Sequence, residues 1–141
     1  MRELKFRVWD KERKEIFVAQ SINRSGCATI LLKNQDILIL PKKQIEIMQY
    51  TGLKDKNGKE IYEGYIVERR KLISAREMAV PGWGKDHTEI RRAVIVYKHG
   101  MFYGRSITAG INTNYSWDEL EADFEIIGNI HENTELLEEE E

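Results

Sequence analysis

Residues 48–64, with the sequence MQYTGLKDKNGKEIYEG, hold a strand–turn–strand pattern that constrains the fold more than any other segment. Apolar and aromatic residues lead into a polar run around Asn57 and Gly58. This dipeptide favours a tight hairpin turn because both residues tolerate positive φ. A second strand-like segment spans residues 61–67, and Gly64 within it permits a bulge or a close backbone approach. The pattern predicts a β-hairpin.

The rest of the chain continues this organisation of short apolar segments separated by turns. Every second residue between 4 and 8 is apolar, which is the period of a half-buried strand, and residues 93–97 are apolar almost throughout. About eight such strands, with turn residues every ~8–12 positions, favour a mostly-β barrel or sandwich. Residues 117–123 predict a short helix capped by Ser116. Residues 74–90 predict an irregular loop, since glycine and proline interrupt them. We also predict a break at residues 21–26 and a loop at residues 108–115.

Composition places the chain among soluble intracellular proteins. Its 141 residues suffice for one ordinary domain or two small ones, and the formal net charge is −2. Five glutamates lie in residues 135–141, so the end is acidic and the body mildly basic. The single cysteine excludes an intrachain disulfide and fits a reducing cytoplasm. No apolar run reaches the ~20 residues of a membrane span, and we expect no contact with membranes.

The sequence shows no arrangement of residues typical of catalysis or of metal binding. Residues 55–60 superficially suggest a calcium loop, but a lysine stands where an oxygen ligand is needed. Cys27, His87, His99 and His131 lack the spacing of zinc ligands or of a motif for nucleophilic catalysis. The many carboxylates lie among turn and surface signals, and no glycine-rich phosphate loop is present. We therefore expect no catalytic residue, no metal and no cofactor.

One region combines basic and aromatic side chains in a way that suits nucleic acid. Residues 68–98 carry a basic excess, and such residues interleaved with aromatics can contact phosphates and stack on bases. The candidate nucleic-acid surface consists of Arg69, Arg70, Lys71, Arg91, Arg92 and Trp83. The isoelectric point of 6.0 argues against this reading, because nucleic-acid-binding domains are usually strongly basic. An ordinary charged loop explains the same residues.

Aromatic residues in the predicted loops are candidates for contact with a protein partner. The candidate interface residues are Trp83, Tyr115 and Trp117, because exposed aromatic side chains mark interfaces. Packing of the same rings into the core is the alternative, because large aromatic side chains bury much apolar area. Self-association through strand edges is a further hypothesis, since a partly open barrel leaves edges to cover.

Three blocks of the sequence resemble the YopX family of phage and prophage proteins. They are residues 6–10 (FRVWD), the segment 48–64, and residues 124–133 (FEIIGNIHEN) followed by Glu135-Leu-Leu. The blocks lie in the family's order and cover both ends and the middle. Two departures are Tyr65, where members usually have aspartate, and Thr134, where they usually have proline. The resemblance implies a small mostly-β protein with an SH3-like barrel, a phage or prophage origin and a bacterial host cytoplasm. It implies no reaction.

Together these observations predict a mostly-β chain in which an amino-terminal β-hairpin region packs on a carboxy-terminal SH3-like barrel. We assign residues 1–47 to the hairpin region, 48–133 to the barrel and 134–141 to an acidic tail. The function we expect is that of a non-enzymatic phage or prophage accessory protein that binds a protein partner or itself. Nucleic-acid binding through residues 69–98 is the alternative. The predicted core is Phe6, Val8, Ile61, Val67, Val94, Val96, Phe102, Phe124, Ile126 and Ile130.

Overall fold

A computed structural model describes residues 4–77 and 84–137, and they form a mostly-β chain. The strands are β1 (Phe6–Asp10), β2 (Glu15–Val18), β3 (Ser21–Ile22), β4 (Ala28–Leu31), β5 (Ile37–Leu40), β6 (Ile45–Lys54), β7 (Glu60–Tyr62), β8 (Tyr65–Ile73), β9 (His87–Lys98), β10 (Met101–Ser106), β11 (Asn114–Tyr115) and β12 (Glu125–Asn129). The helix α1 spans Trp117–Asp123, and short 3₁₀ turns cover Lys42–Gln44, Ala75–Glu77 and Thr134–Leu137.

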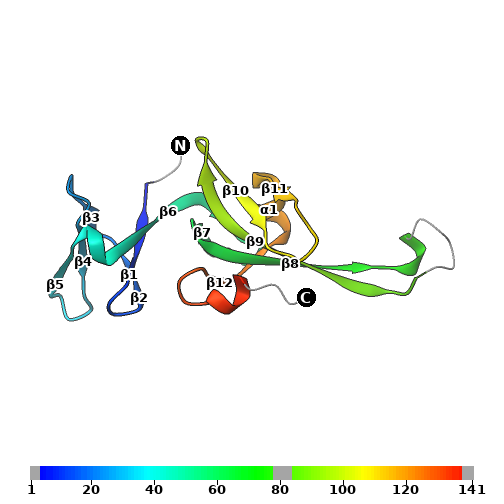
Figure 1. Cartoon of the computed structure of the whole chain (residues 1–141), viewed down its shortest axis with the longest axis horizontal. Coiled ribbons are helices and arrows are strands. Elements are labelled where there is room, and N and C mark those ends of the chain that lie inside the picture. The colour runs from blue at the N-terminus through cyan, green and yellow to red at the C-terminus, as the bar shows by residue number, and fades with distance from the viewer. Residues whose placement is uncertain (1–3, 78–83, 138–141) are drawn as a thin grey trace.

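The strands form three antiparallel sheets arranged along an elongated molecule (Figure 1). Their orders are β2-β1-β6-β7, β3-β4-β5 and β11-β10-β9-β8-β12. We call the part built from β1–β5 the amino-terminal lobe and the part built from β7–β12 and α1 the carboxy-terminal lobe. The far halves of β8 and β9, residues 69–73 and 87–91, extend away from both as the β8–β9 arm (Figure 1).

The amino-terminal lobe has a small core of its own between two sheets. Val8 of β1, Ile30 of β4 and Leu40 of β5 are buried together with Ala28 and Ile45. Successive residues of a strand point to opposite faces. Val8 therefore enters this core, whereas the neighbouring Trp9 joins the larger core of the carboxy-terminal lobe. Strand β1 is thus a wall shared by the two cores.

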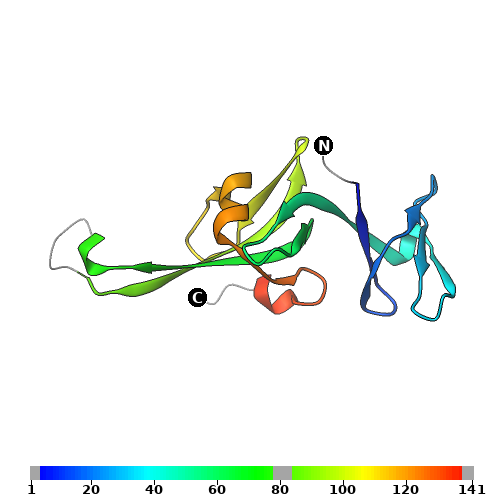
Figure 2. The same cartoon turned by 180° about the vertical axis from the view of Figure 1, so that it is seen from behind.

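The larger core lies between β6, the five-stranded sheet and α1. Phe102, Phe124 and Leu120 are fully buried in it, and Leu120 is the residue through which α1 packs inward. Figure 2 shows α1 in front of the strands that it covers. The predicted helix at 117–123 is confirmed, and Ser116 occupies its N-cap position. The Ser116 side chain makes no capping hydrogen bond to the backbone, contrary to our expectation, and its hydroxyl instead donates to the Glu119 carboxylate at 3.2 Å.

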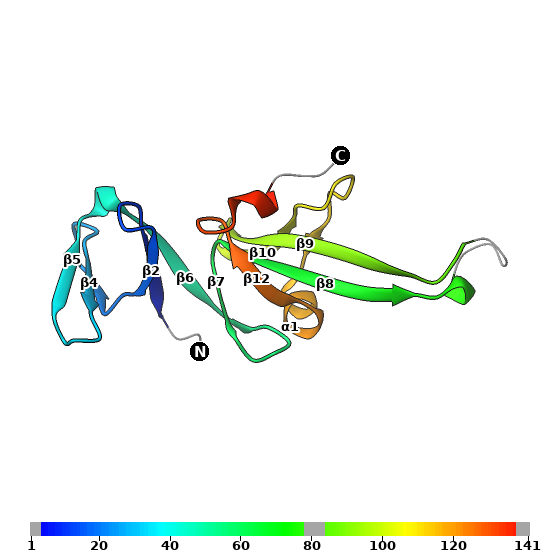
Figure 3. The same ribbon diagram turned by 90° about the horizontal axis from the view of Figure 1, so that it is seen from below.

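Strand β6 runs from the amino-terminal lobe into the carboxy-terminal lobe (Figure 3). Ile45 at its start belongs to the small core, and Met48 and Tyr50 further along belong to the large one. The boundary assigned between residues 47 and 48 therefore falls inside a continuous strand. Because β1 pairs with this strand over Phe6–Asp10, the two lobes share a sheet.

The hairpin predicted around Asn57 and Gly58 is confirmed. Strands β6 and β7 pair on either side of it, and Gly58 has a φ of 83°. The Asp55 carboxylate accepts hydrogen bonds from the backbone N–H groups of Asn57 and Lys59, both at 2.9 Å. Its second oxygen accepts the Ile126 N–H at 3.0 Å, which ties the turn to β12. The Asp55 carboxylate therefore has a structural role, which is to accept hydrogen bonds that hold the turn in place.

Two parts of the sequence reading need correction. Strand β9 begins at His87 and β8 continues to Ile73, so the irregular segment predicted at 74–90 is shorter than expected. The short strands β3 and β11 lie where we predicted turns or loop. Of the predicted core, Phe6, Val96, Ile126 and Ile130 are half-buried and the others are buried. The tail that we assigned begins with a 3₁₀ turn at Thr134–Leu137, and residues 138–141 lie outside the described residues.

Candidate functional site

Strands β8 and β9 carry the arginines that the sequence grouped into one basic surface. In their antiparallel register, Arg69 lies opposite Arg91 and Glu68 lies opposite Arg92. Because neighbours in a strand point to opposite faces, Arg69 and Arg91 share one face of the paired strands, and Arg70 and Arg92 share the other. The four arginines therefore do not form a single surface.

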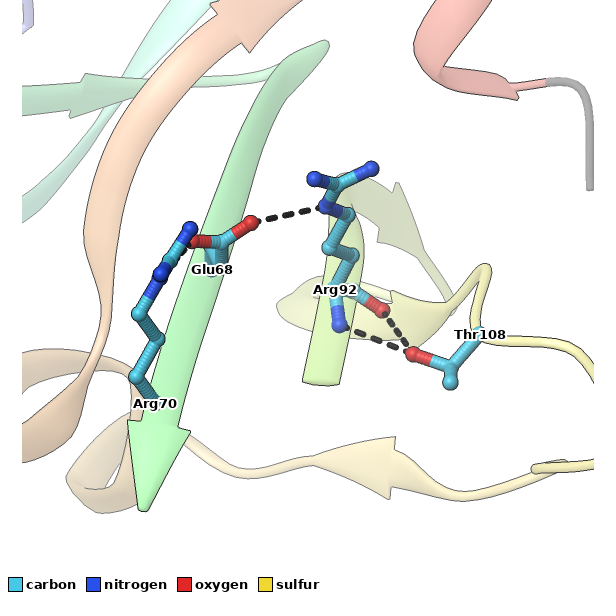
Figure 4. Close-up of polar contacts among 4 residues, drawn as sticks. All are labelled: Glu68, Arg70, Arg92 and Thr108. Carbon is cyan, nitrogen blue, oxygen red and sulfur yellow. Dashed lines mark hydrogen bonds and ion pairs between the residues drawn. The ribbon is translucent and has the colours of Figure 1, made fainter. Parts of the chain in front are cut away.

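On one face, a buried carboxylate holds two of these arginines (Figure 4). Glu68 is only 3% exposed. Its Oε1 accepts the Arg70 Nε–H at 2.7 Å and its Oε2 accepts the Arg92 Nε–H at 2.8 Å. The backbone N–H of Arg92 donates to the Thr108 hydroxyl at 2.8 Å, which fixes the strand beside the loop after β10. Glu68 thus links two strands and orients both guanidinium groups.

The charge state of Glu68 follows from these contacts. Burial raises the pKa of its carboxyl, but the hydrogen bonds from Arg70 and Arg92, together with their positive charges, lower it by more. The net effect places the pKa of Glu68 below its ordinary value, so the carboxylate is ionised at neutral pH.

On the opposite face, Arg69 and Arg91 share a second carboxylate. The Glu89 Oε1 lies 3.6 Å from Arg69 Nη2 and 3.1 Å from Arg91 Nε. The Arg69 guanidinium also lies over two core rings, 5.7 Å from the centre of Tyr115 and 5.5 Å from that of Phe124. Such contacts between a cation and an aromatic face are attractive. Arg69 therefore covers the end of the core.

These pairings weaken the hypothesis of a nucleic-acid surface. Each of the four arginines already lies beside a carboxylate, which a phosphate would have to displace. Lys71 is exposed but lies opposite Glu89 in the register. Trp83 lies outside the described residues. What remains on either face is a mixed-charge strand surface.

Replacing Glu68 by glutamine tests the structural role of this carboxylate. The variant keeps the side-chain shape but leaves Arg70 and Arg92 without a buried anion. Since a hydrogen bond to a charged group contributes roughly 1.5–3 kcal/mol, we expect the free energy of unfolding to fall by about 2 kcal/mol. Urea denaturation followed by circular dichroism measures the change. Glu121→Gln, at an exposed position of α1, is the control and should change stability little. Equal effects of the two variants would contradict the assigned role.

The aromatic residues proposed as interface anchors differ in their positions. Tyr115 is only 2% exposed, and its ring lies 4.9 Å from that of Phe124. It is a core residue, so its selection as an exposed anchor was wrong. Trp117 begins α1 and is 39% exposed, which leaves it accessible to a partner.

The structure exposes an apolar surface elsewhere, on the amino-terminal lobe. Leu31 of β4 lies directly opposite Ile37 of β5, and Ile39 follows on the same face of the sheet. We call these three residues the β4–β5 outer face. Ile37 and Ile39 are 67% and 65% exposed. A groove of about 650 Å³ beside Leu31 also includes Val18 of β2.

The sequence analysis missed this surface, although a signal was present. Residues 37–40 read Ile-Leu-Ile-Leu, so both faces of the strand are apolar. A strand at the edge of a two-layer lobe buries one face only. In such a strand only every second residue needs to be apolar, but all four residues of this strand are. The sequence therefore indicated that one pair of apolar side chains would face outward.

In the part of the chain that the structure describes, no three His, Cys, Asp or Glu side chains are grouped to hold a metal ion. His131 stacks on Trp9 with ring centres 5.3 Å apart, and burial lowers the pKa of its imidazole. Within the described residues, no helix has the length and apolar character needed to cross a membrane.

Comparison with known proteins places this two-lobed β fold in a defined class. The family described as YopX protein matches residues 5–138, and the chain belongs to this family. It is similar to protein EF1440 from Enterococcus faecalis, with 26% identity, a TM-score of 0.59, and coverage of 98% of this chain and 100% of that one. It is also similar in fold to yopX from Bacillus subtilis, with 19% identity, a TM-score of 0.55, and coverage of 95% and 98%. No curated protein matches the sequence.

Proposed function

We propose that this protein is a non-enzymatic binding module that associates with a second copy of itself through β5. The observation that carries the proposal is the pair of highly exposed isoleucines, Ile37 and Ile39, on a strand whose outer edge pairs with no other strand of the described residues. Exposed apolar edges invite pairing with another chain, and natural proteins usually cover or blunt them. A partner that covers β5 removes this hazard and buries apolar area.

The hydrogen-bonding groups of β5 support this arrangement. The Leu32 N–H donates to the Asp36 carbonyl at 2.9 Å, which makes these residues a hydrogen-bonded pair of the β4–β5 ladder. In an antiparallel ladder such pairs alternate with pairs that do not exchange hydrogen bonds. Ile37 and Ile39 occupy the latter positions, so their N–H and C=O groups point away from β4. Pro41, which has no N–H, ends this free edge.

One antiparallel register matches the free groups of two copies. With Leu38 opposite Leu38 of the second copy, Ile37 of each chain faces Ile39 of the other. Four backbone hydrogen bonds can then form, and the exposed isoleucines become cross-strand pairs on the same face. Apolar cross-strand pairs stabilise sheets. A two-fold axis at Leu38 generates this interface, which is the commonest symmetry of soluble dimers.

Self-association is tested by light scattering coupled to size-exclusion chromatography over a range of protein concentrations. We expect a concentration-dependent dimer for the parent chain and a monomer for Ile39→Lys, because the lysine places a charge in the apolar pair. Leu72→Lys is the matched control, since Leu72 is 68% exposed but lies on the β8–β9 arm. This control should dimerise like the parent.

Two results would overturn the proposal. A parent chain that stays monomeric at every concentration would show that β5 does not pair with a second copy. Equal loss of the dimer in Ile39→Lys and Leu72→Lys would place the contact elsewhere. Circular dichroism of both variants excludes unfolding as the cause of a monomer.

The finer assignments of fold and origin are also proposals. We infer that the carboxy-terminal lobe is an SH3-like barrel, supported by its five-stranded antiparallel sheet and by the closure of its core by α1. We further infer a phage or prophage origin and action in a bacterial cytoplasm, supported by membership of the YopX family. The non-enzymatic assignment rests on the lack of a catalytic motif in the sequence.

Nucleic-acid binding remains the alternative function and has less support. Arg69, Arg70, Arg91 and Arg92 are divided between two faces of β8 and β9 and paired with Glu68 and Glu89. Within the part of the chain that the structure describes, no such internal partner covers the β4–β5 outer face. The geometry therefore favours a protein contact through the amino-terminal lobe.

A further inference from the structure

A pocket of about 500 Å³ lies where the two lobes meet. It is built by residues of β1, β2, β7, β8 and β12 and of the turns beside them. The lining residues are Arg7, Ile16, Lys59, Glu60, Tyr65, Ile126, Gly128, Asn129 and Glu132. None of them belongs to β4 or β5, so the pocket is separate from the proposed dimer contact.

Arg7 is held in this pocket without an anionic partner. Its Nη1 donates a hydrogen bond to the Tyr65 hydroxyl, and its guanidinium carbon lies 4.6 Å from the centre of the Tyr62 ring. No carboxylate of a described residue forms an ion pair with it, and its Nε is buried without an acceptor. An unpaired buried donor costs free energy, so a ligand that supplies an acceptor there gains by pairing with it.

Two further donors line the pocket. The Tyr65 hydroxyl accepts from Arg7, and no described residue accepts the proton of that hydroxyl. Burial raises the pKa of this phenol, with the Arg7 charge and hydrogen bond acting against the rise, so the proton is retained at neutral pH. Lys59 lines the same pocket and forms no ion pair within the described part of the chain.

The acidic residues of the lining, together with the basic ones, determine the net charge of the pocket and so the charge of a ligand that suits it. Glu60 is neutralised by Lys5, whose Nζ lies 2.6 Å from its Oε2. Glu132 accepts a hydrogen bond from the Asn129 side-chain amide at 3.1 Å and forms no ion pair within the described residues. With Arg7 and Lys59 counted against Glu132, the pocket carries one net positive charge. This balance suits a monoanion better than a dianion.

We propose that this pocket binds a small molecule through a single carboxylate group. One carboxylate oxygen accepts from Arg7 and the other from the Tyr65 hydroxyl, with Lys59 flanking the charge. Arginine is suited to this task because its planar donors match a carboxylate. The apolar part of the ligand lies against Ile16 and Ile126, which come from opposite lobes.

Nuclear magnetic resonance of the nitrogen-15-labelled chain tests the proposal with benzoate as the probe. Benzamide is the uncharged probe of the same shape, and inorganic phosphate tests a dianion. We expect saturable shifts of the Arg7 Nε–H and of the backbone amides of Lys59 and Ile126 with benzoate only. Arg7→Gln should lower the affinity for benzoate by about tenfold or more, as expected for loss of a charged hydrogen bond. Arg105→Gln, at an exposed position of β10, should bind like the parent.

Tyr65→Phe is the second variant, since it keeps the ring and removes only the hydroxyl. It should weaken benzoate binding by a smaller factor than Arg7→Gln, and the spectrum of each variant shows whether it is folded. The proposal is overturned by non-saturating shifts with benzoate, by equal binding of benzoate and benzamide, or by unchanged affinity in folded Arg7→Gln. Tighter binding of phosphate than of benzoate would overturn the assigned ligand class.

Discussion

Replacing Phe124 by alanine is expected to lower the free energy of unfolding by about 4 kcal/mol, within the range measured for truncation of a buried phenylalanine. The ring is fully buried, lies 4.9 Å from Tyr115 and receives the Arg69 guanidinium over its face at 5.5 Å. Alanine removes these contacts and leaves a cavity. The residue also joins α1 to β12, so the cavity opens where helix and sheet meet.

Chemical denaturation of the parent and variant chains measures this loss. Trp117→Ala is the matched control, because it removes a large aromatic side chain from the other end of α1, where the side chain is 39% exposed. We expect the control to cost about 1 kcal/mol, since surface substitutions usually have small effects. If the two variants were equally destabilised, burial of Phe124 would not be the source of its contribution.

Replacing Asp10 by alanine is expected to cost about 3 kcal/mol, because several donors to one buried carboxylate lose their acceptor. The Oδ1 of Asp10 accepts the N–H groups of Glu12 and Arg13 at 3.0 and 3.2 Å and the Gln44 Nε2–H at 2.9 Å. Its Oδ2 accepts from Arg13 Nη1 at 2.9 Å. The carboxylate thereby joins the β1–β2 turn to the 3₁₀ turn before β6.

The same residue makes stability depend on pH. Burial acts to raise the pKa of Asp10, but the hydrogen bonds from Gln44, Arg13 and the backbone outweigh it and lower the pKa to about 2 from 3.8. A folded-state pKa below the unfolded one stabilises the fold above pH 3.8. This contribution is lost as pH falls from there toward 2.

Denaturation at a series of pH values between 7 and 2 checks this expectation. The difference in stability between the parent and Asp10→Ala should be constant at neutral pH and shrink in acid. Glu121→Ala, at an exposed site of α1, should show no comparable change in its difference from the parent. A gap between parent and Asp10→Ala that persists undiminished at pH 2 would be incompatible with the lowered pKa.

Local sequence patterns were sufficient for several elements because their causes are local. The turn at Asn57–Gly58 depends on a glycine that accepts positive φ and on the neighbouring Asp55 carboxylate. The helix at 117–123 begins after a serine, and its one buried residue, Leu120, faces the core. Three blocks of the sequence indicated the YopX family, and this assignment was confirmed by a match of the family over residues 5–138.

The arginine surface was predicted less well because a strand was ended too early. The sequence reading stopped that strand at Val67, whereas β8 continues to Ile73. Within a continuous strand, adjacent Arg69 and Arg70 must point to opposite faces. Extending the predicted strand by three residues would have placed Arg69 and Arg70 on opposite faces. The sequence could not predict which carboxylate each arginine pairs with, because long-range packing sets the register between β8 and β9.

The sequence by itself determined the mostly-β class, the central hairpin, the short helix and the family, since alternation, turn chemistry and motif order are properties of neighbouring residues. The tertiary structure alone decided that Tyr115 is buried, that Ile37 and Ile39 face outward, and that Arg7 meets Tyr65 between the lobes. These outcomes depend on residues as far apart as 7 and 65. Their proximity arises from strand pairing and core packing, which no local pattern encodes.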